Sequence, residues 1–521
     1  MSEPRDLVHH DRHKSEIVIL LSLNIMEGAT CKCSDCEWGC RQPLWDTANP
    51  FVEQALQYAV AAARVIFIEK GKKDALEKIL LRGLHITIVG CNDFYSYRSQ
   101  IEARGISLTR EALAALPSFS PITFNIGDSD GVNTGNCKPE VAKTGLGSSA
   151  AMTTSVVAAL LHYLGVVELP SSSSGLSEQK IGDSNLDIVH IIAQSAHCVA
   201  QGKIGSGFDI SAAVYGSQRY VRFSPAVLSS AQLAGNCALD VISDILKQRW
   251  DHESSRFSLP PLMSLLLGEP GTGGSSTPSM VGSVKLWQKA DPGKALETWA
   301  RLAGANARLE SQLKLLNIFA KDQWDTYKHV IEVCSNCVPE KWMEQVVDGS
   351  QELIFKSLLG ARDAFLEIRF HMQQMGKAAG VPEAVEWIDQ STSASPTLAD
   401  DRQAARRRGQ RQAARRRGRR QTARRRRRSL ASQIEPDSQT RLLDATMRMK
   451  GVLLAGVPGA GGFDAVFSII LGAAADAVAD AWSAAGVLPL LVKEDSRGIV
   501  LEASDPRTAG LPSALSAIQI H

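Results

Sequence analysis

The sequence predicts a mixed α+β fold with at least two domains, and three observations lead to this prediction. The chain has 521 residues, 44% of them hydrophobic, which is enough to bury more than one core. Apolar residues recur with helical spacing at 49–63, 295–315 and 352–375. Short apolar runs at 84–89 and 451–457 have the length of strands, and polar or glycine-rich turns follow them. Helices and strands are therefore interspersed along the chain.

The first 48 residues form a divergent segment, which we predict to be disordered. The segment is polar and rich in histidine at first, and it then contains Cys31, Cys33, Cys36 and Cys40. Thiolates at short spacing can bind zinc, but these cysteines do not form repeated Cys-x-x-Cys pairs, and no histidine follows closely. We therefore favour a disordered N-terminus over a zinc site.

Membrane and export signals are not evident in the sequence. No stretch approaches the length of a membrane span, and the apolar run at 17–26 is too short and lacks a cleavage site. The ten scattered cysteines are typical of reduced thiols. We expect a cytoplasmic protein, a monomer or dimer, with no membrane partner. A peroxisomal location stays open, although Gln519-Ile520-His521 is not a peroxisomal tripeptide.

A glycine- and serine-rich segment at 143–151, Lys-Thr-Gly-Leu-Gly-Ser-Ser-Ala-Ala, stands directly before an apolar segment at 150–164. Glycine allows positive φ and a close approach of the backbone to a ligand. The first turn of a buried helix here would present free N–H groups and the positive end of the helix dipole. This pattern favours a phosphate site, although it lacks the Gly-Lys-Ser/Thr ending of a P-loop. A helix entry that binds nothing is the alternative for this loop alone.

A second loop, 202–209, follows an expected helix at 186–200. Lys203 and Asp209 are its only charged residues, and they stand among glycines. A kinase needs such a pair, because a cation offsets the charge of the transferring phosphate and a carboxylate serves the acceptor or the metal.

Two further loops could contact an anionic substrate. The loop at 92–98 ends in Arg98, whose guanidinium suits a carboxylate or phosphate. The segment 268–280 is rich in Gly, Ser and Thr, and Lys285 follows it. By themselves these segments could equally be a surface loop and a flexible linker.

Near the C-terminus, the strand expected at 451–457 leads into a glycine-rich turn at 458–464 and then into a helix that opens at 465–471. The segments 488–493 and 498–503 are expected to pair as a hairpin.

Residues 383–433 form an insertion that we predict to be disordered. Residues 402–428 contain 15 Arg and no acidic residue, in a repeat of nine residues. Dense arginine repels itself and has no apolar groups to bury. Without this stretch the chain has 42 basic and 55 acidic residues, which argues against a general preference for nucleic acid. Nonspecific anion binding by 402–428 is possible, without base stacking because no aromatic residue stands among the arginines.

The chain resembles the GHMP small-molecule kinases and, within them, the plant-type phosphomevalonate kinases. The resemblance spans about residues 49–507 apart from the insertion, and it rests on five ordered motifs, at 92–98, 139–151, 201–209, 268–277 and 456–464. It implies an N-terminal α+β domain that binds ATP, a C-terminal ferredoxin-like α/β sandwich, and an active site between them. We place the first domain at 49–225 and the second at 262–382 and 434–510.

The resemblance also implies roles for individual residues. Asp209 is the expected catalytic aspartate, and Lys203 is expected to clamp phosphate. Ser148 and Ser149 are expected to help hold magnesium. The expected ATP-binding residues are Lys143, Thr144, Gly145, Leu146, Gly147, Ser148, Ser149, Ala150 and Ala151. The expected substrate-binding residues are Arg98, Ser275, Ser276, Thr277 and Lys285, and the expected support loop comprises Gly459, Gly461, Gly462 and Asp464.

The implied reaction is the ATP- and magnesium-dependent phosphorylation of (R)-5-phosphomevalonate to the 5-diphosphate in the mevalonate pathway of isoprenoid biosynthesis. The chain departs from the family pattern in two places. No Pro-Gly-Lys motif precedes Asn49, and 197–201 lacks the acidic metal ligand of related kinases. Without the first motif, the opening strands of the first domain are expected to be missing. Two alternatives stay open: a related kinase such as mevalonate kinase, or an inactive family member that binds RNA or other anions through its arginine repeat.

Overall fold

The computed structural model describes residues 7–9, 17–22, 49–81, 85–90, 96–115, 147–171, 183–234, 238–271, 277–380, 434–459, 461–462, 465–490, 492, 494 and 496–502. Helices and strands alternate along these residues, so the predicted α+β class is confirmed. The described chain belongs to two compact units. The first takes its residues from 1–100, 114–258 and 492–521, and the second from 101–113 and 259–491.

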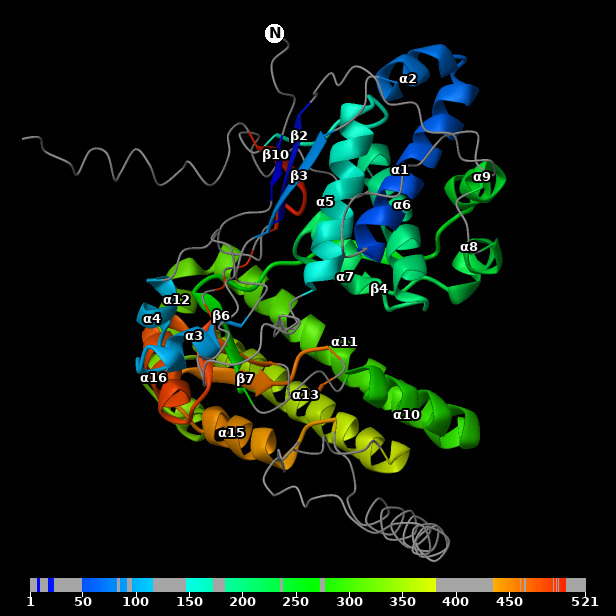
Figure 1. The fold of residues 1–521 in the computed structure, drawn as a ribbon. Coiled ribbons are helices and arrows are strands. Elements are labelled where there is room, and N and C mark those ends of the chain that lie inside the picture. Colours follow the sequence, from blue (N-terminus) through cyan, green and yellow to red (C-terminus); the bar gives the residue numbers. More distant parts are fainter. Residues whose placement is uncertain are drawn as a thin grey trace, which may run out of the picture. The chain divides into compact units, whose positions relative to one another are not determined.

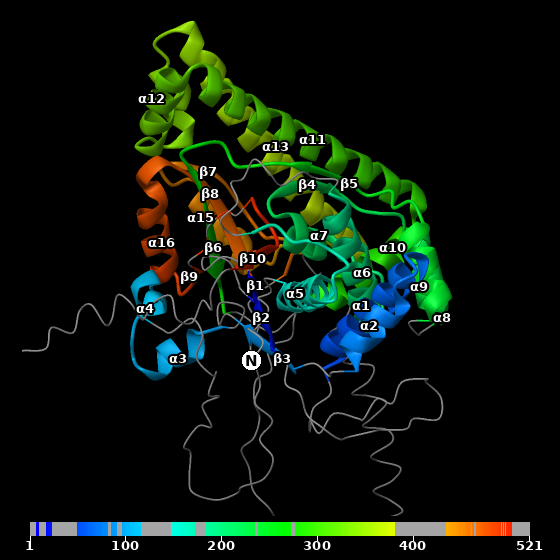
Figure 2. The ribbon, with the colours of Figure 1, turned by 90° about the horizontal axis from the view of Figure 1, so that it is seen from above.

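Three long helices form the centre of the first unit: α1 (Pro50–Glu69), α5 (Ser148–Tyr163) and α6 (Ser184–Gln201). They lie side by side in Figures 1 and 2 and contact one another pairwise. Asn49 caps α1, because its side-chain oxygen accepts hydrogen bonds from the amides of Phe51 (3.1 Å) and Val52 (3.4 Å). Shorter elements surround this core: α2 (Lys73–Leu80), α7 (Phe208–Tyr215), β4 (Gln218–Val221), η2 (Pro225–Leu228), α8 (Ser229–Ala234), α9 (Leu239–Lys247) and β5 (Glu253–Arg256).

Helix α1 has the length and composition of a membrane-crossing helix, with a mean hydropathy of 1.3. The prediction that no stretch approaches this length was therefore wrong. Tyr58 and several alanines of α1 are fully buried, and the helix packs on α5 and α6. Its apolar composition therefore serves the core of the unit.

A four-stranded sheet in the order β10-β1-β2-β3 completes the first unit; its strands are β1 (Leu7–His9), β2 (Ile17–Ser22), β3 (His85–Gly90) and β10 (Val500–Glu502). The prediction of a disordered N-terminus without opening strands was wrong for β1 and β2. The run Ile-Val-Ile-Leu-Leu-Ser of β2 suits a strand, and it pairs antiparallel with all of β3. The cysteine cluster of the predicted zinc alternative lies outside the described residues.

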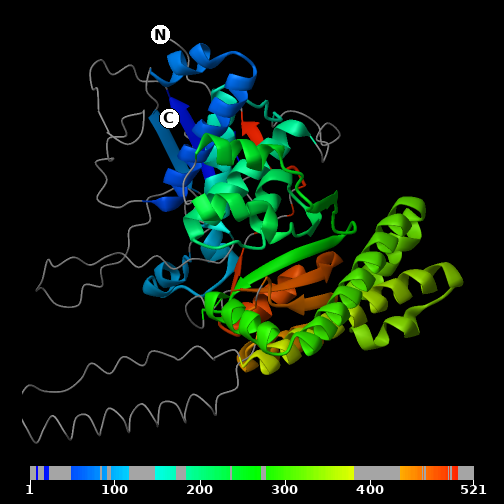
Figure 3. The ribbon, with the colours of Figure 1, turned by 90° about the vertical axis from the view of Figure 1, so that its right-hand side faces the viewer.

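The second unit contains a four-stranded antiparallel sheet in the order β7-β8-β6-β9. Its strands are β6 (Met263–Glu269), β7 (Val452–Gly456), β8 (Val466–Leu471) and β9 (Leu488–Leu490). Helices α13 (Gly349–Ala379) and α15 (Asp437–Met447) pack on β7, and α16 (Ala475–Ala484) packs on β6 and β9. Figure 3 shows the long helices of this unit beside its green and orange strands.

The helical segments predicted at 295–315 and 352–375 are confirmed, because they lie within α11 (Pro292–Asp322) and α13. These two helices contact each other. Helix α3 (Arg98–Ala103) begins in the first unit and continues into the second. The other helices are α4 (Arg110–Ala114), α10 (Thr277–Ala290), α11 (Pro292–Asp322), α12 (Trp324–Ser335), η3 (Pro339–Gln345), α13 (Gly349–Ala379), α15 (Asp437–Met447), η4 (Gly472–Ala474) and α16 (Ala475–Ala484).

Two predictions for the C-terminal region were wrong. The segment after the glycine-rich turn is strand β8, not a helix, because its Val-Phe-Ser-Ile-Ile-Leu sequence fills the position between β7 and β6. The hairpin does not form either, because β9 pairs with β6 and β10 pairs with β1 in the other unit. Strand β10 therefore lies in the first unit, although the sequence placed residues up to 510 in the second domain.

The arginine-rich insertion lies outside the described residues, but its two ends are held together. Gly376, one turn before the end of α13, packs against Ile434, where a Cβ on the glycine would lie 2.7 Å from the Ile434 amide nitrogen. Glu435 forms a buried ion pair with Arg369 of α13 at 2.5 Å. The chain therefore leaves and re-enters the second unit at neighbouring points.

We expect that replacing residues 383–431 with a linker of about six Gly and Ser residues raises the free energy of unfolding by no more than about 2 kcal/mol, because each halving of a flexible loop lowers its closure cost by only about 0.6 kcal/mol. Urea denaturation of both proteins measures this effect. At low salt, the protein without residues 383–431 should also be retained less strongly on heparin than the full chain. Unfolding of the deleted protein would contradict the structural account of these two ends.

His190 of α6 is a fully buried histidine in the first unit. Its ring lies 4.7 Å from that of His252 and 5.5 Å from that of Tyr215. Among the described residues neither ring nitrogen has a hydrogen-bond partner. Burial, assisted by the neighbouring His252, lowers the pKa of His190 to about 3.

We expect the free energy of unfolding to fall as the pH decreases below about 6.5, the ordinary pKa of histidine. In this range the unfolded chain takes up a proton that folded His190 does not bind, since its folded pKa is about 3. The loss between pH 7 and pH 5 is about 2 kcal/mol from this residue. His190→Phe should remove this part of the pH dependence in urea denaturation, whereas the same change at exposed His329 should not. An unchanged pH dependence in His190→Phe would contradict this role.

Candidate active site

The described part of the glycine- and serine-rich motif forms the start of α5. Gly147 is the N-cap residue, with φ of +83°, which is the left-handed conformation that glycine favours. Ser148 and Ser149 follow in the first turn and are half-buried, while Ala150 and Ala151 are buried. Lys143, Thr144, Gly145 and Leu146 lie outside the described residues.

The first turn of α5 presents backbone donors, as the sequence predicted. The amide of Ala151 donates to the carbonyl of Gly147 at 3.0 Å, and it is therefore used inside the helix. The amides of the first turn before it have no acceptor within an α-helix. Their N–H groups and the helix dipole together favour an anion at this end.

The second predicted loop brings Asp209 next to this turn. Gly207 is the N-cap of α7, with φ of +81°, and Asp209 lies in the first turn of the helix. A Cβ built on Gly147 would lie 3.8 Å from the Cβ of Asp209. The glycine-rich motif and the predicted catalytic aspartate are therefore neighbours in the folded unit.

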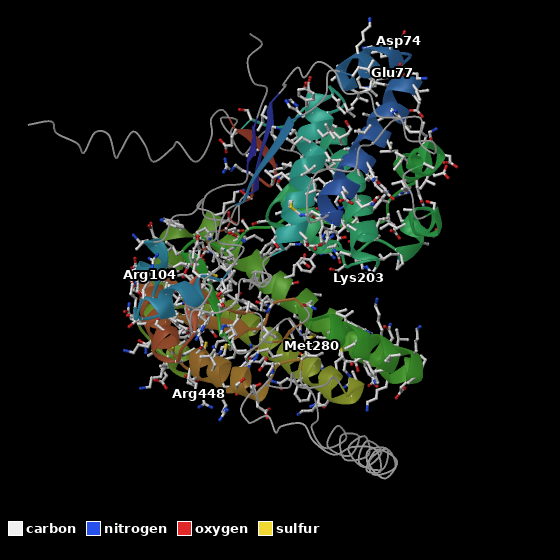
Figure 4. All side chains as sticks on the ribbon, viewed as in Figure 1. Asp74, Glu77, Arg104, Lys203, Met280 and Arg448 are labelled. Carbon is white, nitrogen blue, oxygen red and sulfur yellow. The ribbon has the colours of Figure 1, made fainter. Side chains whose placement is uncertain are left out.

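Lys203 begins the same loop, directly after Gly202 ends α6 with a left-handed conformation. Figure 4 labels Lys203 at this end of α6. Its amide donates to the carbonyl of Cys198 at 3.2 Å, and its side chain is exposed. Tyr220 holds the middle of the loop, because its hydroxyl donates to the carbonyl of Ser206 at 3.2 Å.

Sequence reasoning missed His197 of α6, whose ring contacts Ser149 at the start of α5. Its Nε2 is 3.1 Å from the Ser149 hydroxyl. The Gln201 side-chain nitrogen lies 2.6 Å from Nδ1 and 2.8 Å from Nε2 of the His197 ring. Burial lowers its pKa, the Asp209 carboxylate opposes this shift, and Lys203 adds to it. The available signal was its position on α6, one turn before the charged loop; the sequence drew attention only to the missing carboxylate there.

The predicted support loop lies in the second unit. Gly459, Gly461 and Gly462 all have positive φ, and the amide of Gly462 donates to the carbonyl of Ile434 at 2.8 Å. The support-loop turn is thus joined to the chain that follows the insertion. Asp464 of this turn lies outside the described residues.

The predicted substrate-binding residues are only partly described. Arg98 is half-buried at the start of α3, and its amide donates to the Ser96 hydroxyl at 3.2 Å. Lys285 is exposed on α10, which begins at Thr277. Ser275 and Ser276 lie outside the described residues.

Comparison with known proteins places the chain among the kinases that its motifs resemble. Residues 139–217 match the GHMP kinases N terminal domain, and this span includes the start of α5 and the loop to Asp209. "Phosphomevalonate kinase, peroxisomal" from Arabidopsis thaliana is 53% identical over 478 residues, which are 91% of this chain and 83% of that protein. The chain belongs to the phosphomevalonate kinase family. The resemblance inferred from five motifs is therefore confirmed.

More distant phosphomevalonate kinases also match. "Phosphomevalonate kinase erg8" from Aspergillus fumigatus is 28% identical over 81% of this chain and 64% of its own length. Among solved structures, a phosphomevalonate kinase from Streptococcus pneumoniae, in complex with phosphomevalonate and AMPPNP, aligns with a TM-score of 0.40 and 14% identity. That alignment covers 93% of this chain and 92% of the bacterial one.

Proposed function

We propose that this chain transfers the γ-phosphoryl group of ATP to (R)-5-phosphomevalonate, which yields (R)-5-diphosphomevalonate and ADP in the mevalonate pathway of isoprenoid biosynthesis. The observation that carries the proposal is the 53% identity to the plant phosphomevalonate kinase over 91% of the chain. The adjacent positions of Gly147 and Asp209 support it, because the start of α5 and the residue that carries the carboxylate are then neighbours.

The start of α5 is the proposed site for the nucleotide phosphates. Gly147 lies next to Asp209, and the first-turn amides of α5 have no acceptor within the helix. The hydroxyls of Ser148 and Ser149 add side-chain donors at the same end. This arrangement stabilises the negative charge of the triphosphate and positions it for transfer.

Asp209 and Lys203 are the proposed catalytic residues. An oxygen of the phosphomevalonate phosphate forms a bond to the γ-phosphorus, and the bond from that phosphorus to the β-γ bridging oxygen breaks, so that ADP leaves. The accepting phosphate is largely an anion near neutral pH and needs little deprotonation. Bringing two anions together is the harder task, so Asp209 orients the groups and Lys203 offsets their charge.

Magnesium is the proposed cofactor together with ATP. In the described part of the chain no group of three His, Cys, Asp or Glu side chains converges as a metal site. Magnesium commonly binds one or two protein oxygens together with substrate phosphates, and the Ser148 hydroxyl and the Asp209 carboxylate fit that need. The Ser149 hydroxyl already contacts His197. When bound, the ion would neutralise charge on the phosphates.

Ser275, Ser276, Thr277 and Lys285 are proposed to contact phosphomevalonate, and Arg98 is proposed to add a guanidinium. Gly459, Gly461, Gly462 and Asp464 are proposed to support the nucleotide site. We keep the cytoplasm as the proposed location. A fluorescent fusion of the full chain tests it against the peroxisome, which the name of the plant relative gives for that protein.

ADP release by the purified chain, measured with ATP, magnesium and either phosphomevalonate or mevalonate, tests the proposed reaction. We expect turnover with phosphomevalonate and less than about 1% of that rate with mevalonate, because the site would lose its charged contacts to the missing phosphate. Turnover with mevalonate alone would assign the chain to the alternative kinase. No turnover by folded protein would favour the inactive alternative.

A further inference from the structure

We propose that His197 is a positioning residue of the phosphoryl transfer, which fixes the Ser149 hydroxyl at the start of α5 beside Asp209. This inference rests on the proposed function of the same site. It assigns a task to a side chain on α6, in the region where the sequence lacks the acidic metal ligand of related kinases. The imidazole instead joins the nucleotide turn to the helix that leads into the catalytic loop.

The proposal includes an assignment of the ring nitrogen of His197 that carries the proton. A neutral imidazole has one donor nitrogen and one acceptor nitrogen. The amide nitrogen of Gln201 can only donate, and it lies 2.6 Å from Nδ1 and 2.8 Å from Nε2. As part of this proposal we place the acceptor at Nδ1, because Nε2 also lies next to the Ser149 hydroxyl. Nε2 then donates to the Ser149 oxygen, 3.1 Å away.

This assignment has a consequence for Ser149. Because its oxygen accepts a hydrogen bond from the ring, its own O–H is left to donate elsewhere. The hydroxyl sits in the first turn of α5, where the backbone donors already favour an anion. His197 would therefore turn the hydroxyl proton toward a phosphate oxygen of the nucleotide.

The surroundings of His197 hold the ring in place. Only 2% of its surface is exposed, and its ring lies 5.4 Å from the ring of Phe51 on α1. Three helices thus meet at this imidazole: α1 through Phe51, α5 through Ser149, and α6, which carries it. A fixed donor avoids the reorganisation that a mobile side chain would need during transfer.

His190 provides a matched comparison on the same helix. It is also buried, but its ring nitrogens have no hydrogen-bond partner among the described residues. It lies seven residues, or about 10 Å, from His197 along α6. A purely structural histidine should respond to substitution as His190 does, through stability alone.

The test compares His197→Leu, His197→Gln, His190→Leu and Ser149→Ala with the wild-type chain by steady-state kinetics. We expect His197→Leu to lower kcat about 10- to 100-fold, with the KM for phosphomevalonate changed less than about 3-fold. His197→Gln should recover to within about 3-fold of wild type, because its Nε2 can donate where the imidazole Nε2 did. His190→Leu should keep kcat within about 2-fold.

The double variant His197→Leu with Ser149→Ala isolates the contact between the two residues. We expect it to be no slower than Ser149→Ala alone, because the histidine acts through the serine hydroxyl. If the kcat losses of His197→Leu and Ser149→Ala multiplied in the double variant, the proposal would be overturned. Equal losses of kcat in His197→Leu and His190→Leu would also overturn it.

A second readout separates this inference from the proposed reaction. The dissociation constant of AMPPNP, measured by calorimetry with magnesium and without acceptor, should rise about 10-fold in His197→Leu and less than about 2-fold in His197→Gln. An unchanged dissociation constant together with an unchanged kcat would refute the positioning role. An inactive wild type that still shows the AMPPNP difference would reject the reaction and keep the role of His197.

Discussion

Asp209→Asn should lower kcat for phosphomevalonate by at least about 100-fold while the chain stays folded. The substitution keeps the size of the side chain and an oxygen that can accept from the Ile210 amide, as the carboxylate does at 3.0 Å. The lost group is the negative charge beside Gly147, at the end of α5 that favours phosphate. Steady-state kinetics together with thermal unfolding measure both effects.

The control for this prediction is Asp183→Asn at the start of α6. Asp183 is the N-cap residue of α6, and like Asp209 its side chain accepts from a backbone amide near the start of a helix, that of Asn185 at 2.8 Å. Asparagine caps a helix about as well as aspartate, so kcat should stay within about 2-fold. An Asp209→Asn protein with wild-type kcat would show that the carboxylate has no part in catalysis.

Gly207→Ala should both destabilise the first unit and reduce activity. Gly207 has φ of +81°, and a Cβ there would lie 2.7 Å from the side-chain oxygen of Gln194 and 2.8 Å from both Phe223 and Tyr220. The left-handed conformation costs a residue with a Cβ about 1–2 kcal/mol, and overpacking adds about 1–3 kcal/mol. We therefore expect a loss of about 2–5 kcal/mol in urea denaturation.

The activity loss follows because Gly207 lies two residues before Asp209. Relief of the overlap requires the start of α7 to move, and a shift of about 1 Å at a reacting group can cost about 100-fold in rate. Gly205→Ala is the matched control in the same loop. The atom nearest to a new Cβ there would be the Gly207 amide nitrogen, at 3.9 Å. Equal effects of the two substitutions would contradict this explanation.

The sequence predicted most of the elements that carry the candidate site, because their signals are local. Glycine followed by serines before an apolar run predicted the start of α5. The charged loop after an apolar helix singled out Asp209, although the sequence analysis placed this residue in the loop and did not predict α7. The main helices of both units are predicted by apolar residues at helical spacing, a pattern that can be recognised within a single short segment of the sequence.

The remaining features depend on contacts between distant residues. Strand β1 pairs with β10 across almost the whole chain, and a three-residue strand such as Leu7–His9 has too short a pattern to reveal its partner. Strand β8 was taken for a helix because glycine-rich turns precede both kinds of element. His197 was overlooked because its role depends on Ser149, 48 residues earlier, and a histidine on an apolar helix is more often a core residue.

Phosphorus NMR of the reaction mixture tests the central claim most directly, because it detects the bond that the proposed reaction forms. With ATP, magnesium and phosphomevalonate, we predict two coupled resonances of a new diphosphate ester that grow in step with ADP, and their absence with Asp209→Asn. ADP that appears only with inorganic phosphate, or a folded chain that leaves the phosphomevalonate resonance unchanged, would contradict the account.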